Sequence, residues 1–288
     1  MAIMKDKSKQ KWSIIIRSKS NMLDLNLSEL WRYKDLIRMF IIRDFTAVYK
    51  QTILGPIWYI LQPLLTTIVY AVIFKGVPQM SSEGQPKMLF YMSGLLLWNY
   101  FSINLIKNSE TFYINSGIFG KVYFPRLTVP IATTISGLLA LFFQLLLLFV
   151  TILYYVYHGA KVQLNYTLIL FPYLLMLVCI LSMSIGMIVS SLTTKYRDLK
   201  HLVGFGIQLA MWVTPVLYPL SQFSDSWLFS IIRMNPMSAI IETFRYSIFG
   251  TGTFTLYDLV YSSIMAFSLL IVGIIIFNKT EKNFIDII

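Results

Sequence analysis

The fold is decided by one run of sequence, SIGMIVSSLTTKYRDLKHLVGFGIQLAMWVTPVLYPL (residues 184–220). Both ends of this run are apolar and free of charge, and a charged packet, KYRDLKH (residues 195–201), lies between them. The hydrocarbon core of a bilayer is about 30 Å thick, which about 20 apolar residues of helix can cross. The run therefore predicts the end of one membrane-spanning helix, a polar loop and a second membrane-spanning helix.

The composition is that of a membrane protein. Hydrophobic residues make up 57% of the 288-residue chain and charged residues only 13%, whereas soluble domains carry about 25% charged residues. The net charge of +11 would suit a nucleic-acid-binding protein if Lys and Arg covered a soluble face. They gather instead in the gaps between apolar runs, so no nucleic-acid partner is expected.

Six apolar segments are long enough to span a membrane, so we expect an all-α integral membrane protein. The predicted spans are residues 53–74, 88–107, 127–157, 164–193, 202–220 and 257–277. Between the last two spans, Arg233 and then Asn235 and Pro236 interrupt an apolar stretch, residues 227–249. We interpret this stretch as a re-entrant pair of half-helices, because non-helical backbone at membrane depth needs protein or water around it. A seventh span is the alternative interpretation.

The distribution of Lys and Arg predicts the orientation. Nineteen of the 24 basic residues fall in segments on the same side as both termini, and five fall on the other side. By the positive-inside rule, both termini are therefore expected in the cytoplasm. Residues 1–27 form a basic tail without the apolar core of a signal peptide. Residues 28–50 repeat apolar side chains at helical spacing, which predicts an amphipathic helix in the inner interface, and residues 51–288 hold the six spans.

Several classes of function find little support in the sequence. The interiors of the predicted spans contain no Asp, Glu, Lys or Arg, whereas ion-coupled carriers use ionisable groups there. The segment GIFGKV (residues 117–122) has a Gly-Lys pair but lacks the first glycine and the hydroxyl of a phosphate-binding loop. No catalytic residue and no metal site is expected, and Cys179 is the single cysteine. ATP that drives transport would therefore bind another chain.

Three short motifs, in this order along the chain, carry a family resemblance. They are RD at residues 43–44 followed by LGPIWYILQPLL at residues 54–65, YRDLK at residues 196–200, and TPVLY at residues 214–218. Together they resemble the permease subunits of type-2 ABC exporters, and more narrowly those that export O-antigen, teichoic acid and capsular polysaccharide. The resemblance covers roughly residues 27–288.

The resemblance implies a homodimer of permeases joined to two ATP-hydrolysing subunits, which would hold ATP and Mg²⁺, so that this chain carries no cofactor of its own. The implied substrate is a lipid-linked glycan, moved from the cytoplasmic to the outer face of a bacterial plasma membrane. A type-2 permease for a small lipid or drug is the alternative within transport. An ion-coupled carrier or a membrane enzyme is the alternative from another class.

The resemblance also implies positions for three sets of residues. The loop between spans two and three is expected to contact the ATPase through Tyr113, Gly117, Ile118, Phe119 and Lys121. The cytoplasmic loop between spans four and five holds Arg197 and Asp198. The half-helices would form an outer gate that includes Arg233, Pro236, Glu242 and Arg245.

Two further hypotheses come from side-chain chemistry. Aromatic side chains near span ends and prolines could let sugar rings slide along a pathway, with an ordinary interfacial belt as the alternative. These aromatic residues are Trp58, Tyr59, Trp98, Tyr100, Phe101, Trp212 and Tyr218. Cations before the first span could attract the pyrophosphate of a lipid-linked glycan, with anionic lipid headgroups as the alternative. These cations are Arg38, Arg43 and Lys50.

Overall fold

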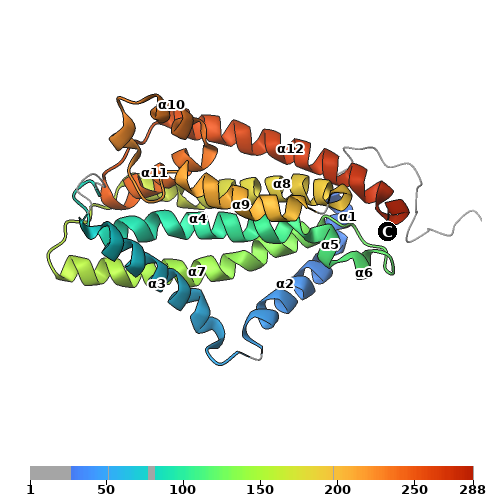
Figure 1. Ribbon diagram of the computed structural model, residues 1–288. Coiled ribbons are helices and arrows are strands. Elements are labelled where there is room, and N and C mark those ends of the chain that lie inside the picture. Colours follow the sequence, from blue (N-terminus) through green and yellow to red (C-terminus); the bar gives the residue numbers. More distant parts are fainter. Residues whose placement is uncertain (1–26, 51, 77–81, 197, 288) are drawn as a thin grey trace, which may run out of the picture.

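A computed structural model describes residues 27–50, 52–76, 82–196 and 198–287 of the chain. These residues form helices and their connections, and none of them lies in a strand. Figure 1 shows the long helices lying side by side as one bundle. The all-α prediction is thus confirmed for this part of the chain. The predicted basic tail lies outside it, except for its last residue.

Five helical segments within the described residues are long and apolar enough to cross a membrane, and they overlap five of the six predicted spans. The segments are Gly55–Gly76, which includes α3 (Trp58–Ile73); α4 (Lys87–Ser109); α7 (Thr128–Tyr157); Tyr166–Lys195, which includes α8 (Phe171–Lys195); and most of α12 (Leu256–Ile287). The protein is therefore a multi-pass membrane protein.

The fifth predicted span is shorter than expected. The helix in that region, α9 (Leu199–Trp212), has 14 residues, which at 1.5 Å each cover about 21 Å, less than the hydrocarbon thickness of about 30 Å. The prediction placed the end of this helix at residue 220. Pro215 and Pro219 have no backbone N–H with which to continue the helix, and the chain turns instead. The count of six spans is therefore not confirmed.

The stretch predicted as a pair of half-helices consists of α10 (Trp227–Met234) and α11 (Pro236–Phe249). Asn235 separates them with an extended backbone, and its side chain caps α11 by accepting a hydrogen bond from the N–H of Met237 at 3.0 Å. Pro236 follows at the first helical position, where a missing N–H does no harm. Neither helix is among the five that could cross a membrane, so the alternative of a seventh span is not supported.

The amphipathic segment before the first span forms two helices rather than one, α1 (Leu27–Arg32) and α2 (Lys34–Tyr49). The break lies at Tyr33, whose backbone leaves helical geometry at φ −94° and ψ 21°. α2 packs against α7 and buries Phe40. Figure 1 shows α2 and α3 leaving the bundle and meeting at an angle.

α4 is the central helix of the bundle. It packs against α3, α7, α8 and α11, and 78% of its most apolar stretch is buried, compared with 6% for the segment that contains α3. The contact between α8 and α4 is tight, because a Cβ on Gly186 would overlap the side chain of Asn108. α9 buries none of its residues. The bundle therefore has a covered centre and two helices, α3 and α9, that are largely uncovered.

One end of the bundle collects the start and the end of the described chain (Figure 1). The short helices α5 (Thr111–Ile114) and α6 (Ser116–Phe119) lie there beside α1 and the last turns of α12. Phe112 stacks on Phe277 with 4.6 Å between ring centroids, and Arg126 Nη1 donates to the backbone oxygen of Glu281 at 2.5 Å. The N-terminal helices, the connection between α4 and α7 and the end of α12 therefore form one surface.

Candidate functional site

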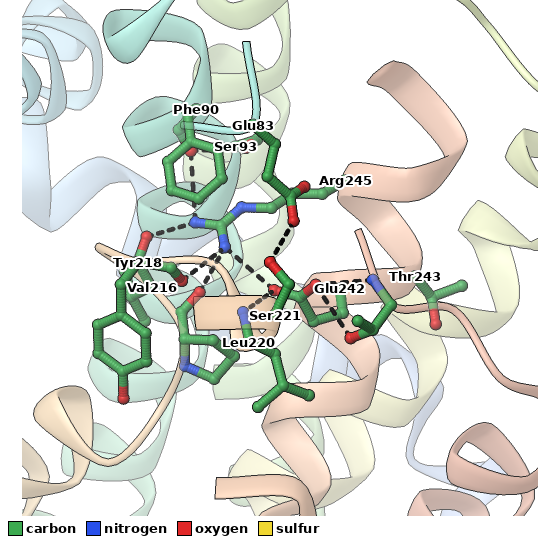
Figure 2. A network of polar contacts seen from close by, with 12 residues as sticks. Glu83, Phe90, Ser93, Val216, Tyr218, Leu220, Ser221, Glu242, Thr243 and Arg245 are labelled. Atoms are coloured by element: carbon green, nitrogen blue, oxygen red, sulfur yellow. Dashed lines mark hydrogen bonds and ion pairs between the residues drawn. The ribbon is translucent and has the colours of Figure 1, made fainter. Parts of the chain in front are cut away.

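A buried ion pair lies within α11, between Arg245 and Glu242 (Figure 2). Both side chains are 1% exposed, and Arg245 Nη1 lies 3.3 Å from Glu242 Oε1. Arg245 also donates to the backbone oxygens of Pro215, at 2.6 Å, and Val216. Its guanidinium lies over the ring of Phe90 on α4, 3.7 Å from the ring centroid. The guanidinium therefore holds the non-helical segment after α9 against α4.

Glu242 completes this network. Its carboxylate accepts hydrogen bonds from the N–H of Leu220 at 3.4 Å and from the N–H of Thr253 at 3.2 Å (Figure 2). It thus connects the segment after α9 with the loop after α11. A buried charge is tolerated only when it is paired and hydrogen-bonded, and both members of this pair meet that condition. The pair anchors the turn at which α9 ends.

The residues predicted to form an outer gate lie in separate places on α10 and α11. Glu242 and Arg245 form the buried pair, whereas Arg233 Nε lies 2.7 Å from Oδ1 of Asp258 on α12. Pro236 begins α11. The two ion pairs fix α10 and α11 to their surroundings, and the gating role of these residues stays a prediction.

Five of the seven aromatic residues predicted to line a pathway lie along two hollows. Trp58, Tyr59 and Tyr100 line a polar cleft between α3, α4 and α7. Trp98 and Phe101 line an apolar groove of about 390 Å³ between α4, α8 and α9. The ring of Tyr59 stacks on the ring of Phe143 on α7, with 6.0 Å between the ring centroids. This contact holds Tyr59 in the wall of the cleft.

The other two aromatic residues lie at the end of α9. Trp212 is 52% exposed, and Tyr218 is buried with its hydroxyl donating to the backbone oxygen of Trp212 at 2.7 Å. The aromatic side chains are thus distributed over three surfaces of one copy of the chain. Their role in a pathway stays a prediction.

The polar cleft between α3, α4 and α7 has a volume of about 370 Å³. Asp44 of α2 and Lys107 of α4 also line it. Its neutral polar side chains, which come from all three walls, are Gln62, Thr66, Asn99, Ser102, Asn104, Ser136 and Gln144. A search for charged residues in the interiors of the spans does not reveal this cleft, because the side chains that line it there are neutral. The amide side chains inside the spans, Gln62 on α3, Asn99 and Asn104 on α4 and Gln144 on α7, are the signal that could have revealed it, because polar groups at membrane depth are costly and mark functional sites.

The three cations predicted to attract a pyrophosphate lie on α2 or directly after it. Arg38 and Lys50 are exposed. Arg43 instead binds its neighbour Asp44, with Nη2 to Oδ1 at 2.8 Å and Nε to Oδ1 at 3.0 Å, and its guanidinium lies over the ring of Phe40. A phosphate at Arg43 would therefore have to compete with a carboxylate oxygen that already accepts two hydrogen bonds from the guanidinium.

The segment predicted to contact an ATPase forms the two short helices α5 and α6. Tyr113 is 68% exposed and Ile118 is 39% exposed, and Gly117 and Lys121 are exposed as well. Phe119 is buried at 4% exposure, with its ring packed against Phe112 and Phe124. Phe119 therefore holds the segment in place, and the exposed residues are the ones that a partner could reach.

The loop between the fourth and fifth predicted spans is attached to this segment by a contact that the sequence did not reveal. Lys200 Nζ lies 2.7 Å from Glu110 Oε1 and over the ring of Tyr113, 5.0 Å from its centroid. The hydrogen bond from Lys200 to Glu110 and the charge of that carboxylate raise the pKa of Lys200. Asp198 directly precedes α9 and makes no side-chain capping bond. Arg197 lies outside the described residues.

A second cation ties the same end of the bundle together. Arg126, just before α7, is 7% exposed and lies with its guanidinium 5.3 Å from the ring centroid of Phe119. Burial lowers the pKa of Arg126, and the nearby carboxylate of Glu281 acts in the opposite direction. Within the part of the chain that the structure describes, no three His, Cys, Asp or Glu side chains come together as a metal site would require.

The chain matches known proteins over most of its length. The family model described as ABC-2 type transporter matches residues 35–249. An O-antigen export system permease protein RfbA of Klebsiella pneumoniae is 30% identical over 256 residues, which cover 88% of this chain and 95% of that protein. A protein of the same name from Myxococcus xanthus is 27% identical over 218 residues, which cover 75% of this chain and 81% of that protein.

Proposed function

This chain belongs to the ABC-2 type transporter family, and we propose that it is the transmembrane subunit of an ATP-driven exporter of a lipid-linked polysaccharide. The substrate is of the O-antigen, teichoic acid or capsule type. It moves from the cytoplasmic to the outer face of a bacterial plasma membrane. In a bacterium with two membranes, this is the inner membrane. Both termini of the permease lie in the cytoplasm.

The observation that carries this proposal is the similarity to permeases named for O-antigen export, which extends over 88% of this chain and 95% of the relative. The match to the family model, residues 35–249, includes most of α2, four of the five apolar segments and the stretch after α9. The absence of charged residues from the interiors of the predicted spans agrees with a transporter whose energy comes from a partner.

The partner in this proposal is a separate ATP-hydrolysing subunit, present in two copies, which binds ATP and Mg²⁺. The permease itself has no catalytic residue and no cofactor. The exposed residues Tyr113, Gly117, Ile118 and Lys121 on and beside α5 and α6 contact the ATPase. Lys200 transmits movement of this segment to α9 through its ion pair with Glu110.

The permease acts as a homodimer. α3 and α9, the two largely uncovered helices, face the second copy and enclose the pathway between them. α10 and α11 form the outer gate. Arg38 and Lys50, which are exposed before the first span, attract the pyrophosphate of the substrate.

Co-purification followed by an ATPase assay tests this function. The full-length chain is expressed with an ABC-type ATPase from the same genome and reconstituted into nanodiscs. ATP hydrolysis is then measured with a lipid-linked glycan, with the polyprenyl lipid alone and with a small amphipathic drug. We expect a stable complex whose hydrolysis rises with the lipid-linked glycan.

Stimulation by the drug or by the lipid alone, and not by the glycan, would instead indicate a permease for small substrates. Failure to associate with an ABC-type ATPase would contradict the proposal as a whole. Tyr113→Ala is expected to weaken the complex, because Tyr113 is exposed in the proposed contact surface.

A further inference from the structure

The polar cleft between α3, α4 and α7 contains two buried oxygen atoms that have no hydrogen-bond partner among the described residues, Asn104 Oδ1 and Gln144 Oε1. Asn104 is 1% exposed and Gln144 is 6% exposed, and both side chains line the cleft. A buried polar atom without a partner is destabilising, and each such atom in a native protein requires an explanation. Two of them in one cavity indicate an occupant that donates hydrogen bonds.

The orientation of the Asn104 amide is fixed by its surroundings. Its Nδ2 donates to the backbone oxygen of Tyr100 at 2.9 Å. Turning the amide over would bring two acceptor oxygens together, so the unpartnered atom is the oxygen. Gly137 of α7 lies directly beside it, and a Cβ at that position would overlap the Asn104 side chain. The Asn104 amide therefore packs closely against the α7 backbone, and its position depends on the glycine.

The lining of the cleft selects against an anion. Asn104 Oδ1 is an acceptor whose orientation is fixed, so it would repel a phosphate and attract O–H or N–H groups. Among the described lining residues, Lys107 is the one cation and Asp44 is the one carboxylate. Tight phosphate binding typically uses several charged donors, often paired guanidinium contacts. A neutral donor of hydrogen bonds therefore fits this lining better than a phosphate does.

The size of the cleft limits the occupant further. Its volume of about 370 Å³ lies within the range of about 300–1,000 Å³ that is usual for small-molecule sites. Ser102 and Ser136, whose hydroxyls donate to the backbone oxygens of their own helices, add acceptors, and the amide of Gln62 can both donate and accept. A ligand with several hydroxyls requires such partners. The neighbouring Trp58 and Tyr59 supply apolar surface in the same wall.

We propose that this cleft binds a polyhydroxyl group whose hydroxyls donate hydrogen bonds to Asn104 Oδ1 and Gln144 Oε1. Two membrane lipids carry such a group: the sugar of a lipid-linked glycan and the glycerol headgroup of phosphatidylglycerol. The sugar source rests on the export function proposed above, whereas the glycerol source does not.

Native mass spectrometry of lipid binding tests the site. The full-length permease, with its ATPase, is reconstituted into phosphatidylcholine nanodiscs without ATP. It is titrated with polyprenyl phosphate glucose, with polyprenyl phosphate and with phosphatidylglycerol. We expect one hydroxyl-bearing probe to bind more tightly than its hydroxyl-free counterpart. Gln144→Met, which removes the acceptor and keeps the volume, should weaken that binding about five-fold, the effect of about one hydrogen bond.

Gly137→Ala should weaken the same binding, because the added methyl group displaces Asn104. Gln163→Met is the matched control, since Gln163 lies in the connection between α7 and α8, is exposed and does not line the cleft. If Gln144→Met weakens the binding of polyprenyl phosphate glucose, the source is the glycan. If it weakens the binding of phosphatidylglycerol instead, the source is the phospholipid.

The proposal is overturned if hydroxyl-bearing and hydroxyl-free probes bind equally, which would indicate a cleft filled with water alone. It is also overturned if Gln144→Met has no effect on binding, or if Gln163→Met has the same effect. Thermal unfolding of each variant, measured in parallel, separates loss of binding from loss of fold. A failure of the export function would leave the phosphatidylglycerol result unchanged, because this assay uses no ATP.

Discussion

At the scale of single residues, Arg245 determines where a neighbouring helix ends. Its guanidinium binds the backbone oxygens of Pro215 and Val216, which a continuing α9 would use for its own hydrogen bonds. Gly94 of α4 provides the room, since a Cβ there would lie 2.5 Å from Arg245 Nη2. The end of α9, the guanidinium and the glycine therefore pack as one unit.

We predict that Arg245→Met lowers the free energy of unfolding by about 3–5 kcal/mol, because it leaves Glu242 as an unpaired buried charge. The measurement is thermal unfolding of the purified protein, followed by its intrinsic fluorescence. The double variant Arg245→Met with Glu242→Gln should recover part of the loss.

Arg233→Met is the control for this prediction. Arg233 is 39% exposed, and its partner Asp258 also accepts a hydrogen bond from the hydroxyl of Thr255, so the loss of Arg233 should cost less than the loss of Arg245, whose side chain and partner are both 1% exposed. Equal unfolding temperatures for Arg245→Met and Arg233→Met would contradict the idea that the buried pair anchors the end of α9.

At the scale of elements, α5 and α6 are too short to be stable by themselves, so their position depends on what they pack against. Phe112 is 1% exposed, stacks on Phe277 of α12 and meets the edge of Phe119 at 6.0 Å. The N–H of Phe112 also donates to the hydroxyl of Ser190 on α8 at 3.3 Å. The surface proposed to meet the ATPase is therefore held by buried aromatic contacts.

We predict that Phe112→Ala destabilises the protein by about 3–5 kcal/mol through the cavity it creates. Amide hydrogen exchange should rise first in α5, α6 and the end of α12, because these elements lose their shared contact. Tyr113→Ala is the neighbouring control: Tyr113 is 68% exposed, and its stability should change by no more than about 0.5 kcal/mol. Similar losses in both variants would show that Phe112 has no special role in holding α5.

At the scale of the whole molecule, α9 is left largely uncovered by the rest of the bundle. α9 buries none of its residues and, at 14 residues, is shorter than a bilayer core. Backbone that is not helical at membrane depth must be covered by protein or line a water-filled space. The segment after α9 is covered on one side by α11 and α4, which leaves α9 itself to face a second copy in the proposed homodimer.

We predict that a cysteine at Leu209, which is 51% exposed on α9, forms a disulfide between two copies in a Cys179→Ser background. Phe149→Cys on α7 is the control, because Phe149 is 60% exposed on a helix that the proposed homodimer does not place at the interface. Oxidation in membranes followed by non-reducing electrophoresis gives the answer. Dimer formation by the α7 cysteine and not by the α9 cysteine would place the interface elsewhere.

The sequence by itself determined the class of fold, the positions of five spans, the two half-helices and the family. These follow from local properties: runs of apolar residues are long enough to cross a bilayer, prolines stop helices, and short motifs stay recognisable in order. The sequence also indicated the break at Asn235, because a capping residue followed by proline acts within a few positions.

Only the tertiary structure decided which polar residues meet. The pairing of Glu110 with Lys200, the carbonyls bound by Arg245, and the unpartnered oxygens of Asn104 and Gln144 all join residues that are far apart in sequence. Nothing in the local pattern of the chain specifies such contacts, since they depend on how the helices are packed against one another. The end of α9 at Trp212 was also decided by the tertiary structure. Pro215 and Pro219 mark a region where the helix can stop, and the buried guanidinium of Arg245 on α11 holds the turn there.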